Sequence, residues 1–284
     1  MLIRIILTMV LALVLAGGVA ADDAKTARAI RLNVGTLILP PDAPARADRV
    51  DLLVHFHGDV KLMTEQFQIA KLPGVLVVIN YNGLSAAYSK PFEDDKLLKK
   101  VMDDALATLK KEGFATDRGD WSKLRISCFS AGFGAVRQLL KHDAWLDRID
   151  AVVAADSIYG GLEGDPVLRR VDGKGMTGFR RFAELASPQA PAGPQPRRFI
   201  VTHSQLHTPT YASTVETADD LIRHIKSQRQ KPTDSQKEAQ PTGMTLLSVA
   251  KCGGFEVFSY AGDDGKAHMQ HLRNISHWWA MLAK

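Results

Sequence analysis

Short apolar runs alternate with helix-like stretches along most of this chain of 284 residues. The runs at 50–56, 74–80 and 149–155 are rich in Val, Leu, Ile and Ala, which is typical of strands buried on both faces. Residues 94–112 instead place apolar side chains at the spacing of an amphipathic helix. Strands of this kind separated by helices predict an α/β fold, with a mostly parallel central sheet and helices on both faces.

The alternation continues to the end of the chain without a break in composition, so we expect a single domain over residues 22–284. Two stretches interrupt it. Residues 160–196 are rich in Gly, Pro and Arg and are expected to form an insertion beside the C-terminal edge of the sheet, and residues 226–243 are polar and are expected to form a surface loop. The remaining expected strands are 29–39 (a strand or a hairpin), 123–128, 198–202 and 255–260, and the remaining expected helices are 131–141, 213–227 and 267–282.

The N-terminal segment 1–21 has the order of a secretory signal peptide. Arg4 precedes an apolar run from Ile5 to Ala16, and small residues follow up to Ala21. The apolar run is short for a membrane span, which needs about 20 residues. We therefore predict cleavage near Ala20 or Ala21, no stable membrane span afterwards, and a secreted or periplasmic protein; an uncleaved membrane anchor is the alternative.

Composition excludes several classes of protein. The formal net charge is +5, but the basic residues form no stripe interleaved with aromatic side chains, so no nucleic-acid partner is expected. Two cysteines are too few for a disulfide scaffold or for a zinc site built mainly from cysteine. Whether Cys128 and Cys252 pair is left open, and the sequence carries no signal for the oligomeric state.

The sharpest motif is the run 125–134 (RISCFSAGFG), in which an expected strand leads through small residues into an expected helix. A nucleophilic serine suits this position, because the turn exposes the hydroxyl of Ser130 and the helix start offers backbone N–H groups to an oxyanion. The run resembles the nucleophile elbow G-x-S-x-G of the α/β-hydrolase superfamily, with Cys128 in place of the first glycine and with Gly132 as the second. The alternative is that Ser130 only caps the helix.

The resemblance implies an α/β-hydrolase-like three-layer sandwich of the serine esterase and lipase type. It also gives a role to the run 55–59 (HFHGD), which is similar to the His-Gly turn before the oxyanion hole in that superfamily. The second oxyanion donor is then the backbone N–H of Asp59 or Val60, beside that of Ala131. A strand end with one buried, hydrogen-bonded histidine is the competing interpretation.

The superfamily order of serine, acid and histidine implies the rest of a catalytic triad. Asp156, directly after the strand at 149–155, is the expected acid, with Asp263 and Asp264 in reserve. His268 is the expected base, because the superfamily places this residue between the last strand and the last helix. His271 is its alternative.

Ligands of open α/β sheets bind at the C-terminal ends of the strands. His203 and Ser204 follow the strand at 198–202 and are therefore candidate pocket residues. The other candidate pocket residues are His55, His57, Gly58 and His271.

Together these features predict an exported serine hydrolase that acts on a small-molecule or acylated substrate through an acyl-enzyme on Ser130, without a cofactor or metal. Ester hydrolysis is expected rather than peptide hydrolysis, by analogy with the superfamily. One alternative is a ligand-binding homologue without catalysis. The other is a metal-dependent hydrolase, whose ligands would come from a set of histidines and one carboxylate: His55, His57, His268, His271 and Asp156.

Overall fold

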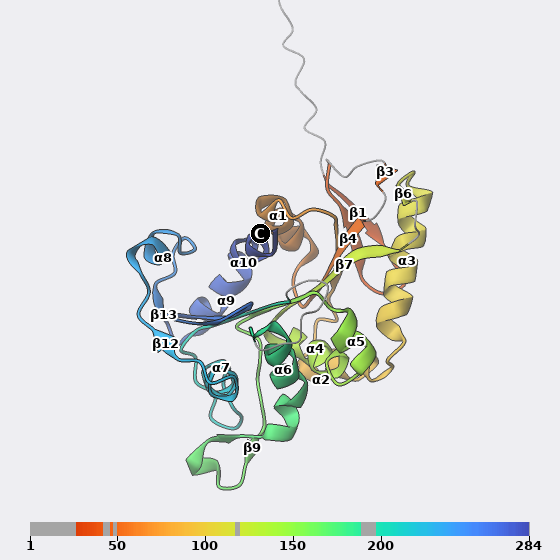
Figure 1. Ribbon diagram of the computed structural model, residues 1–284. Coiled ribbons are helices and arrows are strands. Elements are labelled where there is room, and N and C mark those ends of the chain that lie inside the picture. The colour runs from red at the N-terminus through yellow and green to blue at the C-terminus, as the bar shows by residue number, and fades with distance from the viewer. Residues whose placement is uncertain (1–26, 42–45, 48–49, 117–119, 189–196, 284) are drawn as a thin grey trace, which may run out of the picture.

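The computed structural model describes residues 27–41, 46–47, 50–116, 120–188 and 197–283. The predicted signal peptide and its cleavage positions lie outside these ranges. A ten-stranded sheet runs through the centre of the molecule (Figure 1), in the order β1-β2-β5-β4-β7-β8-β11-β14-β13-β12. Its strands are β1 (Arg28–Arg31), β2 (Thr36–Leu39), β4 (Val50–Phe56), β5 (Val75–Ile79), β7 (Trp121–Phe129), β8 (Ala151–Ala155), β11 (Arg198–His203), β12 (Arg229–Gln230), β13 (Leu246–Cys252) and β14 (Phe255–Tyr260).

The six strands from β5 to β14 in this order are parallel to their neighbours. The strands at the two ends of the sheet pair antiparallel. The C-terminal ends of the parallel strands therefore share one edge of the sheet, where open α/β sheets bind their ligands.

Helices cover both faces of the sheet, as the apolar runs predict. One buried cluster packs α3 (Leu97–Lys111), α4 (Phe133–Leu139), α6 (Gly173–Ala186) and α7 (Thr214–His224) against one face. A second cluster packs α1 (Val60–Ala70), α9 (Gly265–Arg273) and α10 (Ile275–Ala280) against the other. The expected α/β class with a mostly parallel sheet is confirmed. The short elements are α2 (Ser85–Ser89), α5 (Asp143–Arg148), α8 (Asp234–Glu238), β3 (Arg46–Ala47), β6 (Ala115–Thr116), η1 (Pro91–Glu93), η2 (Ser130–Gly132) and η4 (Met281–Ala283).

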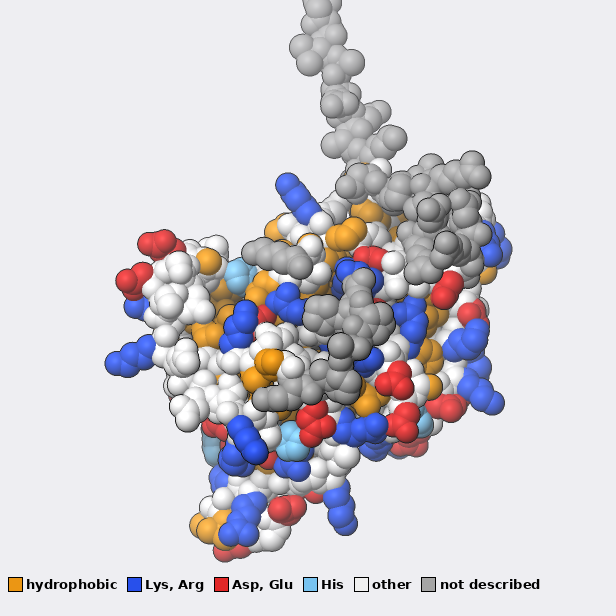
Figure 2. Space-filling view, in the orientation of Figure 1, with side chains coloured by type: hydrophobic (Ala, Val, Ile, Leu, Met, Phe, Trp, Pro, Cys, Tyr) orange, Lys and Arg blue, Asp and Glu red, His pale blue; other side chains and the backbone are white. Residues whose placement is uncertain are grey.

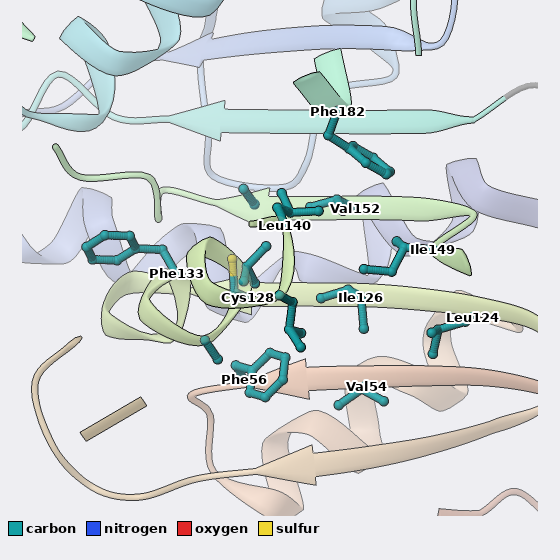
Figure 3. Close-up of a cluster of buried hydrophobic side chains, with 14 of the residues drawn as sticks. Val54, Phe56, Leu124, Ile126, Cys128, Phe133, Leu140, Ile149, Val152 and Phe182 are labelled. Carbon is teal, nitrogen blue, oxygen red and sulfur yellow. The ribbon is translucent and has the colours of Figure 1, made fainter. Parts of the chain in front are cut away.

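A cluster of buried apolar side chains lies beneath the turn that carries Ser130. Phe56 of β4, Cys128 of β7 and Val152 of β8 lie side by side there, with Phe133 and Leu140 beyond them (Figure 3), and all are buried. Burying one such apolar side chain stabilises the fold by about 1.5–3 kcal/mol. The burial of these side chains therefore stabilises the position of the turn.

The stretch 160–196 differs from the expected insertion. Its first part forms a small hairpin, β9 (Leu162–Glu163) and β10 (Arg170–Val171) around η3 (Pro166–Leu168), which projects from the body of the fold (Figure 1). Its second part is α6, a helix of the main layer whose Phe179 and Phe182 are fully buried against Phe199 of β11. A side chain at Gly178 would place its Cβ 2.8 Å from the carbonyl oxygen of Leu140. Glycine thus allows the helix to lie close to α4.

Three further boundaries differ from the sequence prediction. The polar stretch 226–243 contains β12 and α8, and β13 follows it, so this region extends the sheet instead of forming only a loop. The expected last helix is broken at Asn274 into α9 and α10. The expected helix at 131–141 begins two residues later, at Phe133, because Ser130–Gly132 forms a 3₁₀ turn before α4.

The surface seen in Figure 2 carries Lys and Arg side chains interspersed with Asp and Glu. No helix among the described residues is long and apolar enough to cross a membrane.

Candidate active site

Three neighbouring parallel strands end in residues with unusual backbone conformations. His57 after β4 has φ 73°, Ser130 after β7 has φ 45° and Asp156 after β8 has φ 42°. None of them is glycine, and a non-glycine residue in this region costs about 1–3 kcal/mol. Such strain persists where the surrounding structure enforces it, and it marks this edge of the sheet as a candidate functional site.

The turn at Ser130 is shaped by two glycines. A Cβ at Gly132 would lie 2.3 Å from the carbonyl oxygen of Phe56, and a Cβ at Gly134 would lie 2.3 Å from that of Ser85. The helix therefore approaches β4 and α2 more closely than any side chain would allow. The carbonyl oxygen of Ser130 also accepts a hydrogen bond from Ser157 Oγ, at 2.9 Å.

Cys128, where the superfamily pattern has its first glycine, fits beneath this turn as a small buried side chain. Its Sγ lies 3.1 Å from Ser157 Oγ, and burial raises the pKa of the thiol to about 12. A thiol held neutral in this way is a packing group and not a nucleophile. Cys128 and Cys252 are both free, so the pairing that the sequence left open does not form.

Asp156 is the hub of a buried hydrogen-bond cluster. Its Oδ2 accepts hydrogen bonds from His268 Nδ1 at 2.9 Å and from Ser204 Oγ at 2.6 Å. Its Oδ1 accepts from Thr214 Oγ1 at 2.5 Å. Strands β8 and β11 and the starts of helices α7 and α9 thus converge on one carboxylate.

The Asp156 carboxylate is charged despite its burial. Burial alone would raise its pKa, but the hydrogen bond from His268, the nearby imidazoles and the hydroxyl of Ser204 hold that pKa well below its usual range. An ionised acceptor fixes the proton of His268 on Nδ1 and leaves Nε2 as the basic atom.

The candidate nucleophile and the candidate base both neighbour one aromatic residue, Phe129. The imidazole of His268 stacks on Phe129, with ring centroids 4.5 Å apart, and Ser130 directly follows Phe129. Among the described residues, the Ser130 hydroxyl has no hydrogen-bond partner, and none joins it to His268. Hydrogen bonds of this kind are often long before substrate binds.

The reserve candidates are engaged elsewhere. Asp264 caps α9 by accepting a hydrogen bond from the Ala267 N–H at 2.7 Å, and Asp263 is exposed. His271 is fully buried, with its Nδ1 2.7 Å from Thr202 Oγ1, and burial lowers its pKa to about 4. The geometry therefore favours Asp156 as the acid and His268 as the base.

The candidate oxyanion donors lie at two helix starts. Ala131 is within the 3₁₀ turn before α4. Asp59 is the N-cap of α1, with its carboxylate 3.0 Å from the Leu62 nitrogen, and Val60 is the first residue of the helix. The first N–H groups of a helix have no partner within it. Gly58 lets α1 come close, since a Cβ there would lie 2.9 Å from the Met63 side chain.

His55 is a structural residue and not a pocket residue. It is fully buried and burial lowers its pKa to about 3. Trp279 Nε1 donates to Ser127 Oγ at 2.9 Å, and this hydroxyl lies 3.1 Å from His55 Nδ1. His55 Nε2 in turn lies 3.2 Å from the His57 carbonyl oxygen, so the chain of contacts holds the turn that follows β4.

His203 and Ser204 have different surroundings. His203 is buried between the carbonyl oxygen of Ser204, at 2.8 Å, and Arg229 Nη2, at 2.9 Å, and burial with the Arg229 charge lowers its pKa to about 4. Its ring borders a polar cavity of about 340 Å³ together with Arg229. Ser204 belongs to the Asp156 cluster instead.

Sequence reasoning missed two residues of this region. Thr214, the first residue of α7, donates to Asp156. Tyr88, on α2, has its hydroxyl 2.7 Å from His57 Nδ1. Neither lies in a recognisable motif, because both contacts join segments that are far apart in the chain.

The histidines do not form the metal site that the sequence left open. Within the described part of the chain, no three His, Cys, Asp or Glu side chains are grouped so that they could hold an ion. His55 and His271, which that site would need, are each buried and bonded to hydroxyls of the sheet.

Comparisons with known proteins find resemblance in structure only. No family model and no curated protein matches the sequence. Among solved structures, an enterobactin esterase from Shigella flexneri matches with a TM-score of 0.49 at 13% identity, covering 90% of this chain and 60% of that one. A siderophore hydrolase from Aspergillus nidulans matches with a TM-score of 0.47 at 13% identity, covering 89% and 94%.

An α/β serine hydrolase homologue from Coxiella burnetii matches with a TM-score of 0.39 at 12% identity, covering 91% of this chain and 97% of that one. The chain spans only about three fifths of the Shigella esterase and of an uncharacterised protein from Capnocytophaga ochracea. In this chain itself, the mostly parallel sheet with helices on both faces and the strained strand-to-helix turn at Ser130 are features of the α/β-hydrolase fold.

Proposed function

We propose that this protein is a serine hydrolase that cleaves carboxylic esters through an acyl-enzyme on Ser130. The observation that carries the proposal is the 2.9 Å contact between the buried Asp156 carboxylate and His268, at the sheet edge where Ser130 sits in its strained turn. A carboxylate, an imidazole and a serine hydroxyl are the three members of a catalytic triad, and here the hydroxyl belongs to the half-buried Ser130.

The first half of the reaction acylates the serine. His268 Nε2 takes the proton of Ser130 Oγ while that oxygen attacks the ester carbonyl carbon. The resulting oxyanion accepts hydrogen bonds from the N–H groups of Ala131 and of Asp59 or Val60. The intermediate then collapses, the bond to the alcohol oxygen breaks, and His268 returns the proton to the leaving alcohol.

Water completes the cycle. His268 removes a proton from the water as its oxygen attacks the acyl carbon, and the bond to Ser130 Oγ breaks with return of the proton to the serine. Asp156 stays ionised throughout and stabilises the imidazolium that forms twice in the cycle. These steps use no cofactor.

We also propose export of the protein through residues 1–21. Expression with the native N-terminus and N-terminal sequencing of the exported product test this proposal. A new terminus directly after Ala20 or Ala21 supports it, and a product that retains residue 1 in the membrane contradicts it.

The test of the serine mechanism is covalent labelling with a fluorophosphonate, mapped by peptide mass spectrometry with and without a chelator. We expect stoichiometric modification of Ser130 that is insensitive to the chelator, absent in Ser130→Ala and strongly slowed in His268→Ala. A folded wild-type protein that is not labelled would refute the mechanism and favour ligand binding without catalysis.

A further inference from the structure

His57 lies beside the proposed triad but has no part in it. Its half-buried ring is parallel to that of Phe129, with centroids 5.9 Å apart, and the same Phe129 ring stacks with His268. The turn after β4 thus places a second imidazole near His268, against the same Phe129 ring. The hydrogen bonds of Tyr88 and Asn80 determine which nitrogen of His57 carries the ring proton.

Asn80 directly follows β5 and is hydrogen-bonded to Tyr88, the neighbour of His57. Asn80 Oδ1 lies 3.1 Å from the backbone nitrogen of Asn82 and 2.9 Å from the Tyr88 hydroxyl. A backbone N–H is always a donor, so the side-chain atom that faces it is the amide oxygen and not the amide nitrogen. An amide oxygen can only accept, and the Tyr88 hydroxyl therefore donates its proton to Asn80.

This direction fixes the tautomer of His57. A phenol has one proton, and Tyr88 gives it to Asn80, so its oxygen accepts from its other neighbours. The Tyr81 N–H is one of them, at 3.2 Å, and His57 Nδ1 is the other, at 2.7 Å. His57 Nδ1 therefore carries the ring proton.

The remaining ring nitrogen is consequently an acceptor. Burial and the neighbouring His268 lower the pKa of His57, which keeps the ring neutral near pH 7. Among the described residues nothing forms a hydrogen bond with Nε2, and this ring edge points away from Tyr88. It presents one lone pair on a ring that stacks with Phe129, the residue before Ser130.

We propose that His57 Nε2 is a specificity-determining acceptor that receives a hydrogen bond from a hydroxyl or amide N–H group of the substrate, close to the scissile ester. The inference rests on the proposed hydrolase function. A substrate without such a donor leaves a half-buried acceptor unpaired, and sites built around a polar partner discriminate against analogues that lack it. The favoured substrates are therefore hydroxylated or amide-bearing esters and not simple alkyl esters.

The first test reads the tautomer without any activity. Nitrogen-15 spectra of the ring, with the His57 signals assigned by their loss in His57→Asn, report which nitrogen is protonated. We expect protonated Nδ1 and unprotonated Nε2 at neutral pH. Asparagine is the replacement of choice because it tolerates the left-handed φ of 73° at this position. A ring protonated on Nε2 would overturn the proposal.

The second test compares matched esters by titration of the released acid. The pairs are methyl glycolate with methyl methoxyacetate, methyl N-acetylglycinate with methyl N-acetylsarcosinate, and ethylene glycol monobutyrate with its methyl ether. We expect at least one donor-bearing ester to exceed its methylated partner in kcat/KM by about fivefold to tenfold, the effect of one neutral hydrogen bond. The identity of that pair shows whether a hydroxyl or an amide is read, and on which side of the ester.

Tyr88→Phe distinguishes the proposed acceptor role of His57 from a merely structural role. It keeps the ring of His57 but removes the acceptor for its Nδ1 proton, so the proton is free to move to Nε2. We expect the preference for the donor-bearing ester to fall toward unity, as it does in His57→Asn. No preference in wild type, or a preference that survives both substitutions, would overturn the proposal while fluorophosphonate labelling of Ser130 still supports the hydrolase.

Discussion

His57 and His268 share an aromatic neighbour but differ in the hydrogen-bond partner of Nδ1. Both imidazoles stack with Phe129, and both offer Nδ1 to an oxygen atom. The oxygen differs: His268 meets the carboxylate of Asp156, whereas His57 meets the phenol of Tyr88. A carboxylate stabilises an imidazolium and a neutral phenol does not, so the partner of Nδ1 decides which ring can act as a base.

The surroundings of the two partners reinforce the contrast. Three side chains donate to Asp156, and its pKa is held low, so the negative charge beside His268 persists. Burial raises the pKa of Tyr88, so its hydroxyl remains neutral beside His57. In the proposed mechanism, His268 therefore takes up a proton, whereas the neutral ring of His57 accepts a hydrogen bond.

The difference between the two histidines is tested most directly by replacing each ring in turn. We expect His268→Ala to lower kcat on a simple ester by a factor on the order of 10⁴ or more, since the serine loses its base. His57→Asn should leave kcat on the same ester within about twofold, because a simple ester has no donor that could bond to Nε2. Steady-state kinetics on variants with native circular dichroism decide the matter, and similar losses for the two would contradict the assignment.

A second prediction changes the partner of His268 and leaves the ring in place. Asp156→Asn should lower kcat by roughly 10⁴-fold, because an amide favours the wrong tautomer of the imidazole. Asp264→Asn is the matched control, since Asp264 only caps α9 and asparagine also caps helices. A larger loss of activity in the control than in Asp156→Asn would move the acid to the reserve position.

The residues at the C-terminal edge of the sheet could be predicted from the sequence. The apolar runs at β4 and β8 and the strand expected at 123–128, which is part of β7, predicted neighbouring parallel strands, and a polar residue directly after each strand lies at the common edge. Asp156 follows this rule, and its contact with His268 joins residues 112 positions apart. Strand order along the chain was sufficient here because parallel strands bring their C-terminal ends together.

Other parts of the molecule were hidden by competing signals. The glycines of α6 made residues 160–196 resemble an insertion, although Phe179 and Phe182 have the spacing of a buried helix face. Thr214 and Tyr88 could not be identified, because a hydroxyl that points at a distant side chain leaves no local pattern. His55 and His271 looked like ligands, and only their burial shows that they are structural.

A third prediction concerns the two hydroxyl groups that donate hydrogen bonds to the Asp156 carboxylate. Ser204→Ala and Thr214→Val each remove one donor to Asp156 and leave its contact with His268. We expect each to lower kcat by about tenfold or less, since one hydrogen bond to a charged group contributes roughly 1.5–3 kcal/mol and only part of it acts on orientation. KM should remain within about twofold. A change in KM without a change in kcat would place these hydroxyls in substrate binding instead.

The last expected effect is on stability and concerns His271, a third histidine, whose Nδ1 lies beside the neutral Thr202 hydroxyl. Its pKa is lowered from 6.5 to about 4 in the folded protein, first of all by burial. The unfolded chain therefore binds a proton between these pH values that the folded protein does not bind. The stability is fully present above pH 6.5 and falls as the pH decreases toward about 4.

One such group changes the free energy of unfolding by about 1.4 kcal/mol per pH unit in that interval. His271→Phe should reduce the pH dependence of unfolding by this amount, measured as the difference between urea midpoints at several pH values. The phenyl ring keeps the stacking with Trp278 and removes the titrating nitrogen. Parallel curves for the variant and the wild type would mean that His271 is already protonated in the folded protein. The rule that a neutral partner leaves a buried imidazole uncharged would then fail, for His57 as well as for His271.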